Sequence, residues 1–91
     1  KHNANQRYST DAITSFIFKE IGERRKIKSQ EFVVRSDLGC GSTIGPILST
    51  RSGIRTVDVG MPQLSMHSIR ESAGIADVES MFSLIQGFYD R

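Results

Sequence analysis

The sequence predicts an α/β fold built from three helices and two strands. Apolar residues recur at spacings of three and four in three separate stretches, which is the period of an amphipathic helix. Two short runs rich in β-branched and aromatic residues lie between these stretches, as expected of strands. The order is therefore helix, strand, helix, strand, helix, and its centre predicts a right-handed parallel crossover. Because parallel strands need cover on both faces, we expect further strands from outside these 91 residues to complete the sheet.

The first part of the chain predicts a loop, a helix and a strand. Residues 1–9 are polar and have neither helical nor strand periodicity, so we expect a loop there. A helix is predicted from about residue 10 to 25, with an apolar face formed by Ile13, Phe16 or Ile17, and Ile21. Ser9 or Thr10 is expected to cap its first amide groups. The run EFVVR at residues 31–35 then predicts a buried strand.

The second part predicts a helix, a strand, a loop and a last helix. Helical spacing between about residues 43 and 52 comes from Ile44, Ile47 and Leu48, and Gly53 is a natural left-handed terminator. The alternating run at residues 54–60 predicts the second strand. A loop rich in polar groups is expected at residues 63–74, and the last helix is predicted over residues 75–89.

Length and composition bound the class of protein. The chain has 91 residues, 37% of them hydrophobic, and a formal net charge of +2, which is typical of one small globular domain. The longest apolar run is Phe16–Phe18, so we expect no membrane span and no leader peptide. The chain opens at Lys1 without an initiator methionine and closes on a helical pattern, so we expect it to be a piece of something longer.

Charge and cysteine content narrow the partners and the compartment. The positive excess is confined to residues 24–28, so no broad basic face is implied and we expect no nucleic-acid partner. Binding through that run would require a strongly salt-dependent affinity. Cys40 cannot form an internal disulfide or by itself make a zinc site, which favours a reducing compartment, and we expect the cytoplasm.

Three features could carry chemistry, and each has a plainer interpretation. His67 lies in the loop beyond the second predicted strand, where α/β sheets assemble their sites, although a lone histidine is more often structural. If it binds metal, its co-ligands must lie outside the chain, because no His-x-x-x-His or Cys-x-x-Cys spacing is present. Residues 40–46 resemble an anion cradle at a helix N-terminus, but a tight turn with a capping serine is favoured. Cys40 has no identifiable base to activate it, so it is interpreted as a buried small residue.

Four blocks of sequence closely resemble the aspartyl aminopeptidases. These blocks are KHNANQRYS at residues 1–9, FVVRSD at 32–37, CGSTIGPIL at 40–48 and GMPQLSMHSIRE at 60–71. The likeness runs over essentially all 91 residues, with a slight departure at residues 36–39. It implies that residues 1–91 are the C-terminal part of a catalytic domain with a three-layer αβα zinc-exopeptidase-type fold. The family consists of dizinc exopeptidases that remove N-terminal aspartate or glutamate and form large homo-oligomers, commonly dodecamers.

The resemblance also assigns roles to individual residues. It makes His67 a zinc ligand, and it makes Lys1 and Tyr8 substrate-binding residues. The turn at residues 41–43 would border the same cleft. The other zinc ligands, the bridging aspartate and the general-base glutamate have no counterpart here and are expected upstream. The expected location is the cytoplasm, with the vacuole as an alternative.

The resemblance leaves an alternative from another class of protein. The leading hypothesis is a catalytic segment whose parent hydrolyses peptides with an N-terminal Asp or Glu by metal-activated water attack. The alternative is that the piece, when isolated, acts as a non-catalytic oligomerisation or interaction module. Both can hold at once, because one histidine cannot assemble a metal site alone.

Overall fold

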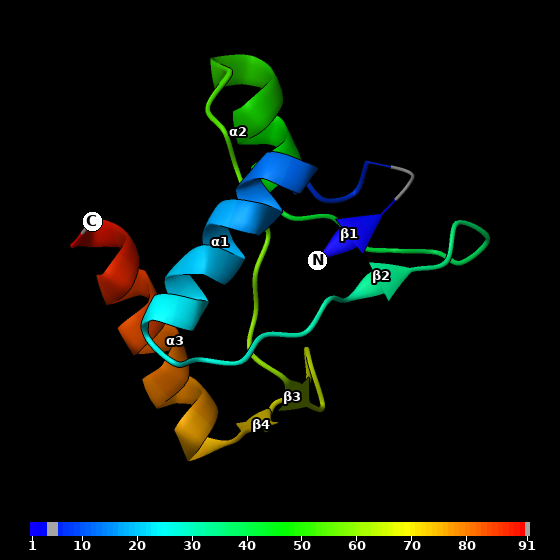
Figure 1. Cartoon of the computed structure of the whole chain (residues 1–91). Helices are drawn as coiled ribbons and strands as arrows, with labels where there is room; N and C mark the ends of the chain where they lie inside the picture. Colours follow the sequence, from blue (N-terminus) through cyan, green and yellow to red (C-terminus); the bar gives the residue numbers. More distant parts are fainter. Residues whose placement is uncertain (4–5, 91) are drawn as a thin grey trace.

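The computed structural model describes residues 1–3 and 6–90 as a mixture of helices and short strands (Figure 1). In chain order the elements are β1 (His2–Asn3), α1 (Ala12–Arg24), β2 (Val33–Val34), α2 (Gly45–Ser52), β3 (Gln63–Leu64), β4 (Ser72–Ala73) and α3 (Ile75–Tyr89). This mixture agrees with the predicted α/β class. The loop predicted at residues 1–9 is wrong at His2–Asn3, which form β1, and its residues 4 and 5 lie outside the described residues.

The first and last helices pack against each other and form the apolar centre (Figure 1). Within the described residues the buried apolar side chains are Ile21 of α1 and Leu84 of α3. Small residues let the two helices approach closely. A Cβ added at Gly87 would lie 3.1 Å from Ile21 Cγ2 and 2.9 Å from Arg25 Nε, so a larger residue there would push the helices apart.

The cap of α1 differs from the prediction by one or two residues. Asp11, rather than Ser9 or Thr10, is the N-cap, and its carboxylate accepts a hydrogen bond from the Thr14 amide at 2.8 Å. Thr14 Oγ1 in turn accepts from the Asp11 amide at 3.1 Å, which completes a reciprocal capping box. The hydroxyls of Ser9 and Thr10 are engaged elsewhere, with Asp58, so they are not available to the helix.

The parallel pairing occurs one element earlier than predicted. β1 pairs with β2 in parallel, with His2 opposite Val33 and Asn3 opposite Val34, and α1 connects the two strands. A strand-helix-strand unit is therefore present, but the predicted crossover between residues 31–35 and 54–60 is wrong. The strand at 31–35 is also shorter and less buried than expected, since Val33 is 66% exposed.

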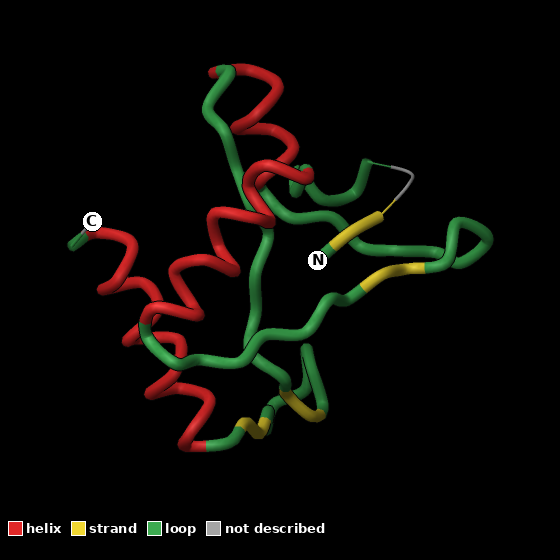
Figure 2. Tube along the Cα trace, viewed as in Figure 1, coloured by secondary structure: helices red, strands yellow, loops and turns green. Residues whose placement is uncertain are grey.

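The segment predicted as the second strand is not one. Residues 54–60 contain no strand and run as an irregular connection from α2 past α1 toward β3 (Figure 2). The Asp58 amide, which a strand partner would have used, donates instead to Thr10 Oγ1 at 2.8 Å. The loop expected at residues 63–74 holds an antiparallel pair, in which Gln63 lies opposite Ala73 and Leu64 opposite Ser72.

The two remaining helices follow the predictions closely. α2 begins at Gly45 instead of 43, and Gly53 ends it in the left-handed conformation, with φ of +70° and its amide bonded to Ser49 O at 3.0 Å. α3 begins at Ile75 and ends at Tyr89, as predicted. Across the described part of the chain, no helix combines the length and apolar character needed to cross a membrane.

The basic run at residues 24–28 is partly neutralised. Arg24 Nε lies 3.2 Å from Glu20 Oε1 one turn earlier in α1, and Arg25 Nη2 lies 3.2 Å from Asp90 Oδ2 beyond α3. These exposed pairs contribute little to stability. They place carboxylates beside two of the four cationic side chains of this run.

Candidate functional site

Two of the three residues that the resemblance singled out lie together. The Lys1 ammonium nitrogen is 5.6 Å from the centroid of the Tyr8 ring, and both residues are half-buried. A cation at that distance from an aromatic face is attracted by the ring quadrupole. This attraction favours side-chain conformations of Lys1 that keep the ammonium near the ring. The structure thus places a positive charge and a phenol side by side near the N-terminal strand.

Tyr8 is held on its other side by the loop that precedes α2. Cys40 Sγ donates to the Tyr8 hydroxyl oxygen at 3.5 Å, and Ser42 Oγ donates to the Arg7 carbonyl oxygen at 3.0 Å. The hydrogen bond with Cys40, and then burial, raises the pKa of Tyr8 above its usual value. Tyr8 is therefore a neutral phenol at physiological pH. Cys40 is half-buried and contacts this phenol, so it is not simply the enclosed small residue that the sequence predicted.

Asp58 organises the polar groups around this pair, although sequence reasoning did not single it out. Only 7% of this residue is exposed, and its carboxylate accepts from the Ser9 amide at 2.6 Å and from the Ser9 hydroxyl at 2.9 Å. Thr43 Oγ1 donates to the other carboxylate oxygen at 2.5 Å. Burial alone would raise the pKa of Asp58, but the donors on Thr43 and Ser9 outweigh it and hold the pKa below its usual value.

The same carboxylate lies at the start of α2. A Cβ at Gly45 would lie 2.9 Å and 3.0 Å from the two Asp58 carboxylate oxygens and 2.7 Å from Ser9 Oγ, so only glycine fits there. A carboxylate of the chain itself therefore lies beside residues 43–45 of the suggested anion cradle and accepts from the Thr43 hydroxyl. The predicted capping serine is wrong, because Ser42 bonds to Arg7 and α2 has no side-chain cap at Ile44.

A signal for Asp58 was present in the sequence. It is the one carboxylate within the alternating run at residues 54–60, where its neighbours Val57 and Val59 are apolar. An acidic residue inside an otherwise apolar run is expected to have hydrogen-bond partners when it is buried. The pattern could not reveal that those partners lie as far away as Ser9, 49 residues earlier in the chain.

His67 occupies the connection between β3 and β4. Its φ is +69°, a left-handed conformation that histidine adopts more readily than most side chains do. The His67 amide donates to Glu71 Oε1 at 2.5 Å, which holds the connection in shape, and the residue is exposed. Within the described residues, no hydrogen bond or ring contact joins His67 directly to Lys1 or Tyr8.

His67 is thus exposed to solvent on a turn that the hydrogen bond from its amide to Glu71 stabilises, and its imidazole is of the type that binds zinc. Within residues 1–3 and 6–90, no group of three or more His, Cys, Asp and Glu side chains is arranged to hold a metal ion. His67 fits the role of a single ligand. A complete zinc site would need ligands from outside this set.

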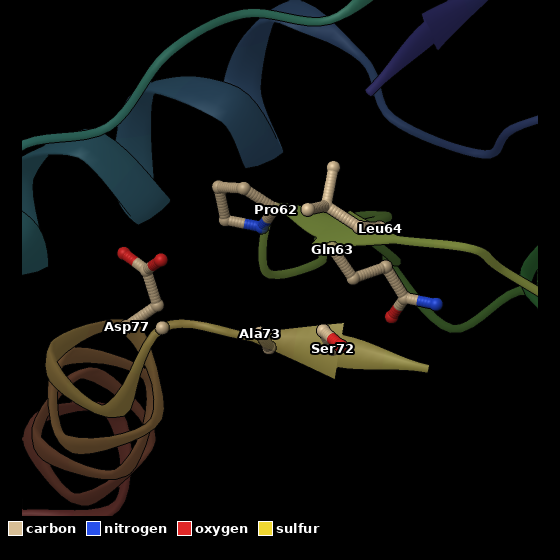
Figure 3. A pocket seen from close by; sticks show the side chains of 7 residues that line it. Pro62, Gln63, Leu64, Ser72, Ala73 and Asp77 are labelled. Carbon is tan, nitrogen blue, oxygen red and sulfur yellow. The ribbon is translucent and has the colours of Figure 1, made fainter. Parts of the chain in front are cut away.

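A hollow in the described surface lies elsewhere. It has a volume of about 330 Å³ and is lined by Pro62, Gln63, Leu64, Ser72, Ala73, Gly74 and Asp77 (Figure 3). It lies between the β3–β4 pair and the first turn of α3, and none of Lys1, Tyr8 and His67 lines it. Because its walls offer one carboxylate and few other charged or hydrogen-bonding side chains, the hollow does not suggest a catalytic centre.

Comparison with known proteins identifies the family. Residues 1–89 match the family model described as "Aminopeptidase I zinc metalloprotease (M18)". A probable aspartyl aminopeptidase from Ricinus communis is 58% identical over 90 residues, which are 99% of this chain and 18% of that protein. The aspartyl aminopeptidase of Dictyostelium discoideum is 53% identical over 91 residues, which are 100% of this chain and 19% of its own length.

Solved structures agree with this match. The chain superposes with a TM-score of 0.91 and 45% identity on a structure described as the Ape4 and Nbr1 complex, covering 97% of this chain and 17% of that one. A crystal structure of prApe1 gives a TM-score of 0.92 at 36% identity, covering 99% of this chain and 19% of that one. The chain spans about a fifth of the length of these relatives. Over that span its sequence and its fold agree with theirs, and the chain belongs to the M18 family of zinc metalloproteases.

Proposed function

We propose that this chain is the C-terminal segment of the catalytic domain of a dizinc aminopeptidase that removes N-terminal aspartate or glutamate from peptides. The match of residues 1–89 to the M18 family carries the proposal, and relatives named aspartyl aminopeptidases support the substrate class. The complete domain would have the three-layer αβα fold of zinc exopeptidases. The short parallel pair of β1 and β2 would be part of its sheet.

Lys1 and Tyr8 would bind the substrate. A half-buried ammonium near an aromatic face is well placed to pair with the carboxylate of the first substrate side chain. A neutral side chain in the same place would leave the ammonium without a partner, which penalises neutral substrates. Tyr8, kept as a neutral phenol by its raised pKa, can donate a hydrogen bond near the reacting group.

His67 would provide one ligand to one of two zinc ions. Bound zinc ions polarise a scissile carbonyl group and lower the pKa of a bound water molecule. The chain's contribution is to hold the imidazole on a turn that the bond between the His67 amide and Glu71 fixes. The remaining ligands and the general-base carboxylate would come from the part of the parent that precedes Lys1.

The parent would work as a homo-oligomer, with a dodecamer as the expected assembly. Its proposed location is the cytoplasm, with the vacuole as the alternative. Neither statement affects the choice of substrate, which depends on Lys1 and Tyr8.

The test uses the intact parent protein. It should hydrolyse an aspartyl chromogenic amide and contain about two zinc ions per subunit, measured by mass spectrometry of the metal. His67→Phe should reduce the activity by orders of magnitude and reduce the zinc content, because it removes a direct metal bond. His2→Phe removes the other imidazole of the chain and should leave the zinc content unchanged. Full zinc content and activity in His67→Phe would disprove the ligand assignment.

A further inference from the structure

The side chain of Lys1 lies against the backbone of Gly60. A Cβ added at Gly60 would lie 3.1 Å from Lys1 Cε and 3.2 Å from Lys1 Nζ. Both distances are shorter than ordinary van der Waals contact, so a methyl group there would force the lysine head to move by a few tenths of an ångström. The φ angle of Gly60 is not in the left-handed region, so an alanine would alter the space around Lys1 without straining the backbone.

Two further contacts bear on the position of Lys1. Its α-nitrogen donates to the carbonyl oxygen of Asp58, two residues before Gly60, at 2.9 Å. Its ammonium is 5.6 Å from the Tyr8 ring, and Tyr8 is itself held because Ser9 binds the Asp58 carboxylate. Asp58 therefore anchors the backbone of Lys1, and Gly60, which has no side chain, leaves room for the head of the lysine.

We propose that Gly60 is a specificity-determining residue, because its lack of a side chain leaves the space in which the Lys1 ammonium meets the acidic side chain of the substrate. This inference rests on the proposed function of Lys1. Gly60 acts only through Lys1, so it is a positioning residue that does not touch the substrate. A small displacement of the charge should weaken the pairing with a substrate carboxylate and leave neutral substrates almost unaffected.

The experiment measures selectivity in the intact parent enzyme. Values of kcat and KM are determined for aspartyl- and alanyl-p-nitroanilide in the wild type, Gly60→Ala and the control Gly39→Ala. A Cβ at Gly39 meets nothing within 4 Å, so the control makes the same chemical change in open space. Gly60→Ala should lower the aspartyl-to-alanyl ratio of kcat/KM by about three- to tenfold, mainly through the KM of the aspartyl substrate. Gly39→Ala should keep the wild-type ratio.

Two further variants separate positioning from folding. In a Lys1→Met background, Gly60→Ala should cause no additional change in the ratio, because the group that it displaces is absent. A general loss of structure would instead lower both rates in either background. Lys1→Arg places a larger head group against the intact Gly60. It should also lower the aspartyl-to-alanyl ratio of kcat/KM. It therefore tests the contact even if Gly60→Ala does not fold.

The outcomes distinguish this inference from the function on which it rests. If Lys1→Met lowers the ratio while Gly60→Ala and Lys1→Arg keep the wild-type value, Gly60 does not determine specificity and only this inference is overturned. If Lys1→Met also keeps the wild-type ratio, the role of Lys1 is wrong, and the inference is overturned with it. An intact protein that hydrolyses neither substrate would overturn the proposed function itself.

Discussion

At the scale of single residues, the charged side chain of the proposed substrate-binding site is constrained by its neighbours. Lys1 has its backbone bonded to Asp58, its stem against Gly60 and its ammonium near Tyr8, so its position depends on three separate contacts. A lysine in open solvent would have none of these constraints. If Lys1 binds substrate as proposed, its ammonium would be oriented before a substrate arrives, which would reduce the conformational entropy lost on binding.

We predict that Lys1→Met separates recognition from chemistry in the parent enzyme. Loss of a charge-assisted hydrogen bond of about 1.5–3 kcal/mol should reduce kcat/KM for aspartyl substrates roughly ten- to a hundredfold. Alanyl or asparaginyl substrates should lose far less. Lys28→Met, which removes an exposed lysine, is the control and should change neither value. An equal loss on acidic and neutral substrates would mean that Lys1 supports the geometry of the site without recognising the side chain.

At the scale of secondary-structure elements, a single carboxylate joins the segments around the site. Asp58 contacts the approach to α1 through Ser9 and the approach to α2 through Thr43, and its amide bonds to Thr10. The start of α2 is fixed by the same contact, since Gly45 leaves no room for a side chain beside the carboxylate. Two helices and the connection at residues 54–62 therefore depend on one buried charge.

We predict that Asp58→Asn destabilises the parent by about 1.5–3 kcal/mol, because a neutral amide is a weaker acceptor and its NH₂ group faces donors. The effect should depend on pH. The pKa of Asp58 is lowered in the folded protein, so its contribution is fully present above the usual carboxyl range and is lost as pH falls through the lowered pKa.

The measurement is the midpoint of thermal unfolding from pH 7 downward. The difference between wild type and Asp58→Asn should narrow toward acid pH. Asp37→Asn is the control, because Asp37 forms an exposed pair with Arg35 that should contribute within about 1 kcal/mol. A difference between wild type and Asp58→Asn that stayed constant with pH would show that the native carboxylate does not carry this stability.

At the scale of the whole molecule, the segment does not enclose its own apolar surface. Within the described residues, Ile21 and Leu84 are buried, whereas Phe16 and Phe82 are 67% and 70% exposed on the two helices that pack together. Exposed apolar area of this kind usually lies against another part of a protein. The relatives are about five times longer than the chain, which agrees with a segment that is completed by a larger domain.

We predict that the isolated chain of 91 residues has no aminopeptidase turnover and binds zinc only weakly. The physical reason is that His67 supplies one ligand, whereas a catalytic zinc site needs about three from the protein. Hydrolysis of an aspartyl chromogenic amide and calorimetric titration with zinc would test this. Turnover by the purified chain, with contaminating peptidases removed, would contradict it.

The sequence by itself determined the helices and the family. Helical periodicity is local, so the spacing of apolar residues placed α1, α2 and α3 within about two residues of their observed ends. Strand pairing is not local, and the alternating run at residues 54–60 resembles a strand although its Asp58 amide bonds to Thr10. The position of His67 after a predicted strand also marked it as a candidate, whereas Lys1 and Tyr8 were named by the resemblance alone.

Only the tertiary structure decided which groups lie around Lys1. The contact between Lys1 and Asp58 joins residues 57 positions apart, and no periodicity in the chain encodes such a distance. The proposed role of Gly60 depends in the same way on the side chain of Lys1, which lies far from it in the sequence. Local sequence patterns determine where the helices form. Long-range packing fixes which side chains meet, and for that reason the constraints on the candidate site became visible only in the folded chain.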